Sequence, residues 1–270
     1  MARLRVASPA HALRLGASAW FVAATLGQWA FVLFIVLFFG GHTLSGDLAG
    51  LNNKPHVTGY VAGDTFGNIQ FIAHALMGGL VTFAGTWQLV PALRRRWPHM
   101  HRWNGRLFLG ISLVAALSGL YLTWVRGSQL GWGSNVSITM NGLLILAFAT
   151  LAWRSALKRD IVRHRKHALR AFLLVNGVWF LRIGIMLAGL ALGPLGIEID
   201  YQGVVFVGVS FASWLLPLAL LELYLRAEGS KLSLPKYAMA LTLGLLSLVT
   251  LAGSAAAAAF MWMPPLAGAK

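Results

Sequence analysis

Basic residues lie in every second gap between the long apolar stretches of this chain. Of its 22 lysines and arginines, 18 fall in four such places. Because cytoplasmic loops of membrane proteins are enriched in Lys and Arg, this alternation predicts a polytopic membrane protein with a cytoplasmic N-terminus. The 18 residues are Arg3, Arg5 and Arg14, then Arg94, Arg95, Arg96, Arg102 and Arg106, then Arg154, Lys158, Arg159, Arg163, Arg165, Lys166 and Arg170, and finally Arg226, Lys231 and Lys236.

The composition agrees with a membrane protein and excludes several other classes. Charged residues make up 11% of the chain, whereas a typical soluble domain has about 25%. The net charge of +15 is confined to short loops, so we expect anionic lipid headgroups as partners and no nucleic acid. The chain has no cysteine, which excludes disulfides, thiolate zinc sites and iron–sulfur clusters.

Seven stretches are long and apolar enough to cross a bilayer, which takes about 20 residues. We therefore predict an all-α fold: a polytopic bundle of seven transmembrane helices, with the C-terminus outside, that forms one membrane domain over residues 1–270. The basic flank of the first stretch is typical of a retained signal-anchor. The predicted spans are Ala19–Phe39, Ile69–Leu89, Leu107–Val125, Val136–Leu157, Leu169–Leu192, Val204–Leu225 and Tyr237–Met261.

Tryptophans stand near both ends of the predicted spans. Amphipathic indole rings gather where a membrane protein meets the lipid headgroups, so we expect these residues to form two interfacial belts. They are Trp97, Trp103 and Trp153 at the inner boundary and Trp124, Trp132 and Trp262 at the outer one.

Histidines and arginines gather where the third and fifth spans begin, near the inner face. His164 and His167 are three residues apart and would share a helix face. Neutral imidazole is the commonest metal ligand, and helical bundles place ligands on facing helices. The pattern therefore favours a b-type haem whose iron is bound by His101 with His164 or His167, with Arg102, Arg106 and Arg170 beside its propionates. The alternative is that these side chains simply lie among lipid phosphates.

A second polar group lies deeper, in the outer half of the predicted bundle. It consists of His74, Asn141 and Arg182, and polar residues at membrane depth are costly and therefore informative. Arg182 follows His164 by 18 residues, or five turns of a continuous helix, so both would face the bundle interior. We predict that the three side chains bind an anionic or carbonyl-bearing ligand. The alternative is that His74 and Asn141 only bridge helices by hydrogen bonds.

Four short motifs carry a resemblance to a known family. They are His74-Ala-Leu-Met-Gly-Gly79, the segment Arg94–Arg106 with His101-Arg-Trp-Asn-Gly-Arg106, the segment Arg163–Arg170, and Leu181-Arg182. Over about residues 68–190 the chain resembles the bacterial predicted-membrane-protein family called domain of unknown function 2306.

The resemblance implies a four-span core over those residues, with additional spans and loops over 1–67 and 193–270. It also implies a multi-pass protein of the bacterial inner (plasma) membrane, but no particular reaction and hence no decision on whether the protein is an enzyme. The four-span layout is similar in architecture to cytochrome b561-like haem bundles.

Three functions are compatible with these patterns. The first is a membrane redox protein with one haem b near the inner face, which exchanges electrons with a quinone or another small acceptor. The second is a non-redox protein that binds or moves a lipid or small amphiphile. The third is a structural membrane component.

The predicted topology is testable with reporter fusions. Gly196 lies between the fifth and sixth spans and Gly229 between the sixth and seventh, so reporters fused at the two positions should report opposite sides of the membrane. Two enzyme reporters provide the measurement, one that is active only outside the cytoplasm and one that is active only inside it, each fused at both positions. The same side for both positions would break the seven-span model.

Overall fold

The computed structural model describes residues 8–53, 58–127 and 130–267, and within these residues it contains helices and no strands. Arg3 and Arg5, which the sequence analysis assigned to a basic N-terminal segment, lie outside the described residues. The α-helices are α1 Pro9–Ile35, α2 Gly41–Ser45, α3 Thr65–Gln88, α4 Pro91–Arg96, α5 Pro98–Trp124, α6 Trp132–Leu157, α7 Ile161–Val175, α8 Gly177–Leu192, α9 Val204–Gly229, α10 Ser233–Ala257 and α11 Met263–Ala267.

Seven helical segments of the described chain are long and apolar enough to span a membrane, which confirms the predicted all-α seven-span fold. Most extend beyond the predicted spans, because a helix continues to satisfy its backbone groups past the apolar core. Which side is cytoplasmic stays a prediction. The segments are Pro9–Ser45, Thr65–Gln88, Pro98–Trp124, Trp132–Leu157, Gly177–Leu195, Val204–Gly229 and Ser233–Leu266.

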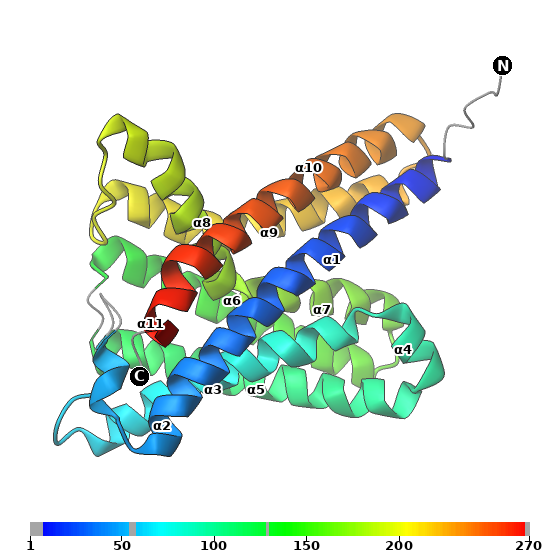
Figure 1. The fold of residues 1–270 in the computed structure, drawn as a ribbon. Coiled ribbons are helices and arrows are strands. Elements are labelled where there is room, and N and C mark those ends of the chain that lie inside the picture. The colour runs from blue at the N-terminus through cyan, green and yellow to red at the C-terminus, as the bar shows by residue number, and fades with distance from the viewer. Residues whose placement is uncertain (1–7, 54–57, 128–129, 268–270) are drawn as a thin grey trace.

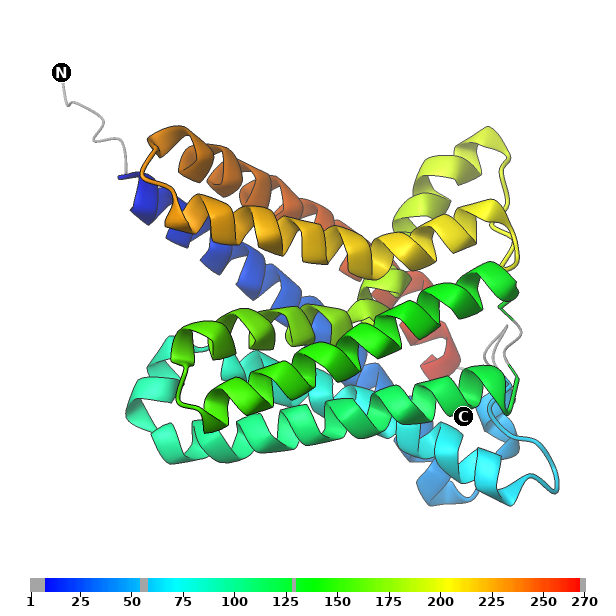
Figure 2. The ribbon, with the colours of Figure 1, turned by 180° about the vertical axis from the view of Figure 1, so that it is seen from behind.

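The loops rich in Lys and Arg all lie at one end of the bundle. The start of α1, helix α4, the α6–α7 connection and the α9–α10 connection lie on the right in Figure 1 and on the left in Figure 2. We call this end the basic end and the other the opposite end. Toward the basic end, α1, α9 and α10 form one group of helices and α3 to α7 form another (Figures 1 and 2).

Helices α1 and α10 lie side by side along most of their length (Figure 1). Their backbones approach closely at Gly16, where an added Cβ would lie 2.8 Å from the Ala240 carbonyl oxygen. At Gly27 an added Cβ would overlap Ser254 of α10 and Trp179 of α8. Small residues let helices in membranes approach closely and gain packing, so these glycines position α1 against its neighbours.

The fifth predicted span is two helices, because the chain breaks at Asn176 between α7 and α8. The side chain of Asn176 is fully buried, and its Nδ2 donates to the Phe172 carbonyl at 2.8 Å. The same carbonyl also accepts from the Asn176 backbone N–H at 3.2 Å, so the side chain adds a second hydrogen bond at the break. The predicted continuous helix from His164 to Arg182 is therefore wrong, and the two residues do not share a helix face by a repeat of five turns.

Trp262 does not lie in the outer aromatic belt, contrary to the sequence prediction. It is 2% exposed, and its ring lies 5.3 Å from that of Phe31 on α1. The residues Ala258–Trp262 form a π-helical segment. A π-helical turn holds more residues than an α-helical one, so it shifts the helix phase and presents Trp262 to α1.

A charged network at the opposite end holds the α2–α3 loop against α5. Arg126 Nε donates to Asp64 Oδ2 at 3.1 Å, and its Nη2 donates to Asn68 Oδ1 at 2.7 Å and to the Gly59 carbonyl at 3.2 Å. The Arg126 side chain is 10% exposed. Because a buried charge needs a partner, this network fixes the loop and the ends of α3 and α5 relative to each other.

The close approach of α1 and α10 predicts a site-specific cost of a single methyl group. Gly16→Ala should lower the free energy of unfolding by about 1–3 kcal/mol, because the Ala240 backbone cannot rotate away. Gly244→Ala on α10 is the matched control, since an added Cβ there meets no described atom within 4 Å. Thermal unfolding in detergent measures both. Equal effects of the two substitutions would contradict the packing model.

Candidate functional site

The inner histidines lie on two neighbouring helices at the basic end. His101 on α5 lies within electrostatic range of His164 on α7. The Nδ1 of His164 is 2.9 Å from the Ala152 carbonyl oxygen of α6. Because a carbonyl oxygen only accepts, this Nδ1 carries a proton, and in the neutral ring Nε2 carries the lone pair. The structure thus fixes one tautomer of His164.

His167 lies one turn further along α7, and its ring stacks on Phe148 with centroids 5.9 Å apart. Its Nδ1 is enclosed and has no hydrogen-bond partner among the described residues. Burial lowers the pKa of His167, and the positive charges of Arg170 and Arg163 lower it further. The lowered pKa favours the neutral imidazole, which is the form that binds metals.

The three arginines near these histidines have different environments. Arg102 and Arg106 are exposed, and the Arg106 guanidinium lies 4.8 Å from the centre of the Trp103 ring. Arg170 forms a bidentate pair with Glu222 of α9, with distances of 2.7 and 2.9 Å. The Arg170 charge is therefore already balanced, whereas those of Arg102 and Arg106 face outward.

No group of three or more His, Asp, Glu or Cys residues that could hold a metal ion occurs among the residues of the structural description. A metal at the inner histidines would therefore have two protein ligands, and the rest of its coordination would come from a group such as a porphyrin.

Asn141 on α6 lies at the break between α7 and α8. Its Nδ2 donates to the Leu174 carbonyl at 3.2 Å. This carbonyl belongs to the last turn of α7, where regular helical partners end. An added Cβ at Gly177 would lie 3.0 Å from the same Nδ2. This bond bridges α6 and α7, whereas the Asn141 Oδ1 is enclosed without a partner among the described residues, so a ligand-binding role for Asn141 stays a prediction.

His74 lies on α3 and packs against Gly119 of α5. An added Cβ at Gly119 would lie 3.0 Å from the His74 ring, and the Ala115 backbone is within hydrogen-bonding reach of it. Its Nδ1 is buried and unpartnered within the described chain. His74 also lies within electrostatic range of Arg182 on α8. The structure thus brings His74 and Arg182 together from different helices.

Arg182 is half-buried, and its guanidinium lies 5.3 Å from the centre of the Phe31 ring of α1. Its Nη1 donates to the Val178 carbonyl at 3.1 Å, and Tyr201 lies within electrostatic range. Its Nε is enclosed without a partner in the described ranges, and none of the ion pairs found there includes Arg182. A guanidinium stays charged in proteins, so Arg182 carries a positive charge that no carboxylate of the described residues pairs with.

Gln28 of α1 is a further polar residue in this region, and the sequence analysis missed it. It is fully buried, and neither its Nε2 nor its Oε1 has a hydrogen-bond partner among residues that the structure describes. Gln28 precedes Phe31 by three residues, which is about 4.5 Å along a helix. It therefore lies within one turn of the contact between Phe31 and Arg182. The sequence could have identified Gln28 by its position nine residues into the predicted first span, because polar side chains at that depth are rare.

We define the central polar site as Gln28, His74 and Arg182, with Phe31 as its aromatic wall. In the described ranges, half of the buried side-chain polar atoms without a partner belong to these residues or to neighbours packed beside them. A buried polar group without a partner costs several kcal/mol in an apolar environment, so native proteins rarely keep one. The site can thus donate and accept several hydrogen bonds to a bound polar group. The neighbours are Thr25, which precedes Gln28 by three residues on α1, and Trp179 and Ser254, which lie against Gly27.

A family model described as Predicted membrane protein (DUF2306) matches residues 71–225. The match confirms the resemblance inferred from the motifs and extends it through most of α9. No curated protein and no solved structure matches the chain. His74 and Arg182 lie within the matched residues, whereas Gln28 lies before them, so α1 adds a side chain of its own to the central polar site.

Proposed function

We propose that this chain, which belongs to the predicted-membrane-protein family DUF2306, is a non-redox membrane protein that binds an amphiphile with an anionic or carbonyl-bearing headgroup in the bundle interior. The observation that supports the proposal is the environment of the Arg182 guanidinium. This group lies against the Phe31 ring and forms no ion pair with a carboxylate in the described part of the chain. The protein is a multi-pass membrane protein, and we place it in the bacterial inner membrane.

The chemistry of the central polar site defines the class of headgroup. Arg182 supplies a positive charge with several donors, which suits a carboxylate, a phosphate or a quinone carbonyl. The Gln28 amide supplies both a donor and an acceptor, and His74 Nδ1 supplies either one according to its tautomer. The three groups together can therefore bind more than one oxygen atom of a headgroup.

The surroundings of the site define the rest of the ligand. Phe31 and Trp179 belong to one apolar cluster formed by α1, α8 and the end of α10. Phe71, Ile72 and Leu76 of α3 pack against the same cluster. An apolar tail or ring bound beside the headgroup would thus contact aromatic and aliphatic side chains, as ligands in small-molecule sites do. A quinone and a long-chain fatty acid both meet these requirements.

The proposal predicts that Arg182→Gln weakens ligand binding. Radiolabelled oleate and a short-chain ubiquinone analogue serve as the anionic and carbonyl probes, with the protein purified in detergent. Loss of a charge-assisted hydrogen bond should weaken binding of at least one probe about tenfold or more.

Arg126→Gln is the control, because Arg126 is also an enclosed arginine but is bound by Asp64 and Asn68 at the opposite end. This variant should lose stability and keep probe binding. If each probe bound the Arg182→Gln protein as tightly as the unaltered protein, the central polar site would be ruled out as the binding site of the probes.

A second candidate function is electron transfer through a haem b bound by His101 with His164 or His167. The supporting observation is the hydrogen bond from His164 Nδ1 to the Ala152 carbonyl, because metal-binding histidines are usually oriented by such a bond from the other ring nitrogen. The exposed Arg102 and Arg106 could pair with propionates. The haem would supply a one-electron centre for exchange with a quinone.

Visible spectroscopy tests the second candidate directly. Protein purified from haem-replete cells should show a reduced-minus-oxidised difference spectrum of a low-spin b-type haem, and His101→Ala should abolish it because one axial ligand is lost. His99→Ala is the matched control, since His99 instead accepts a hydrogen bond from Trp103 at 3.1 Å. A colourless, folded preparation would end the haem proposal.

A further inference from the structure

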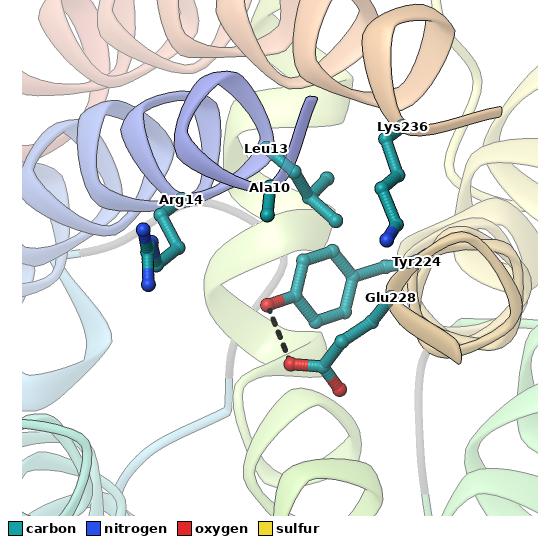
Figure 3. Close-up of a pocket in the computed structure, with 6 residues that line it drawn as sticks. All are labelled: Ala10, Leu13, Arg14, Tyr224, Glu228 and Lys236. Carbon is teal, nitrogen blue, oxygen red and sulfur yellow. Dashed lines mark hydrogen bonds between the residues drawn. The ribbon is translucent and has the colours of Figure 1, made fainter. Parts of the chain in front are cut away.

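A cavity of about 200 Å³ lies at the basic end, between the start of α1, the end of α9 and the start of α10. Figure 3 shows Lys236 of α10 reaching toward Tyr224 and Glu228 of α9, with Ala10 and Leu13 of α1 beside them. Arg14 of α1 completes the lining. The volume is smaller than the roughly 300–1,000 Å³ of a site for a drug-sized ligand, so it suits a single headgroup.

The charge of this cavity is positive. Its one carboxylate, Glu228, is held by Arg165 of α7 in a bidentate pair with distances of 2.7 and 2.8 Å. The Tyr224 hydroxyl lies 3.3 Å from the same carboxylate. Neither Arg14 nor Lys236 takes part in an ion pair found in the described chain. The cavity thus presents two cations whose charge is not balanced by a neighbouring carboxylate.

Two helix N-termini reinforce this positive potential. Helix α1 begins at Pro9 and α10 at Ser233, both at the basic end, and neither start has a side-chain cap among the described contacts. The first turn of a helix carries the positive end of the helix dipole, which attracts anions. The cations and the helix starts therefore favour the same kind of ligand.

The surfaces next to the cavity are apolar and point outward. Leu13 forms a buried wall, while Leu15 of α1 and Leu241 and Leu245 of α10 are 55%, 66% and 56% exposed. In a membrane these exposed side chains contact hydrocarbon. A ligand with a headgroup in the cavity could thus extend acyl chains along α1 and α10.

We infer that this cavity binds the phosphate headgroup of an anionic phospholipid. Basic pockets between transmembrane helices are suited to such headgroups. The cavity lies almost wholly outside the residues matched by the family model. Among the residues that line it, Tyr224 alone falls within 71–225. The site is independent of the central polar site and adds a lipid contact supplied by α1 and α10.

Native mass spectrometry of the detergent-solubilised protein tests this inference, with phosphatidylglycerol as the anionic probe and phosphatidylcholine as the neutral one. The unaltered protein should bind phosphatidylglycerol in preference. The double variant Arg14→Gln/Lys236→Gln should bind it about tenfold or more weakly, because both unbalanced cations are lost. If that variant does not fold, Lys236→Gln alone should still weaken binding about threefold.

The control is Arg95→Gln/Lys158→Gln, which also removes one arginine and one lysine charge, but from exposed positions elsewhere at the basic end. It should leave phosphatidylglycerol binding within about twofold, since these residues do not line the cavity. Equal weakening in both double variants would mean that net charge alone attracts the lipid, and would overturn the site. Displacement of the lipid by free glycerol phosphate at equal affinity would instead identify a soluble ligand and overturn the lipid assignment.

Discussion

Hydrocarbon offers no hydrogen-bond partner, and this constraint determines most of the structure. Each spanning segment must satisfy its own backbone, so all of them are helical. The break at Asn176 is the instructive exception. There the Leu174 carbonyl is bound by Asn141 Nδ2, and the Phe172 carbonyl accepts from both the backbone N–H and the Nδ2 of Asn176. A helix can end inside the bundle because a polar side chain of a neighbouring helix binds a carbonyl of its last turn.

The same constraint gives meaning to the polar atoms that remain unbound in the bundle interior. Arg126 shows how an enclosed arginine is normally accommodated, since Asp64, Asn68 and the Gly59 carbonyl all bind it. Arg182 differs, because its described contacts are the Val178 carbonyl and the Phe31 ring. Together with Gln28, it retains hydrogen-bonding capacity at membrane depth. A headgroup that used this capacity would offset the cost of burying these groups.

Charge at the basic end is divided between pairs that hold helices together and cations that stay unpaired. Arg165 and Arg170 bind Glu228 and Glu222, and so connect α7 to α9 by two bidentate pairs. Such pairs add geometric specificity because both hydrogen bonds must form at once. Arg14 and Lys236 lie beside one of these pairs without joining it. The acidic residues are thus used in the fold, and the remaining basic residues are available to lipids.

The sequence alone determined the class of the protein, the number of spans and the grouping of its basic loops. These features depend on the hydropathy and charge of consecutive residues, which the bilayer selects whatever the helix packing. The motif at His74 and those further along the chain also identified the family. Asn141 and Arg182 were recognised as informative for the same reason, because polar side chains at membrane depth are costly wherever they face.

Only the tertiary structure decided which side chains meet. The break at Asn176 removed the helical phase relation between His164 and Arg182, and the π-helical turn moved Trp262 into the core. Gln28 joined the central polar site because α1 crosses α3 and α8, a contact between segments far apart in the chain. Hydrophobic periodicity says that a residue lies on a helix. It does not say which helix it faces, because helix pairing is set by the packing of small residues such as Gly16 and Gly27 against particular neighbours.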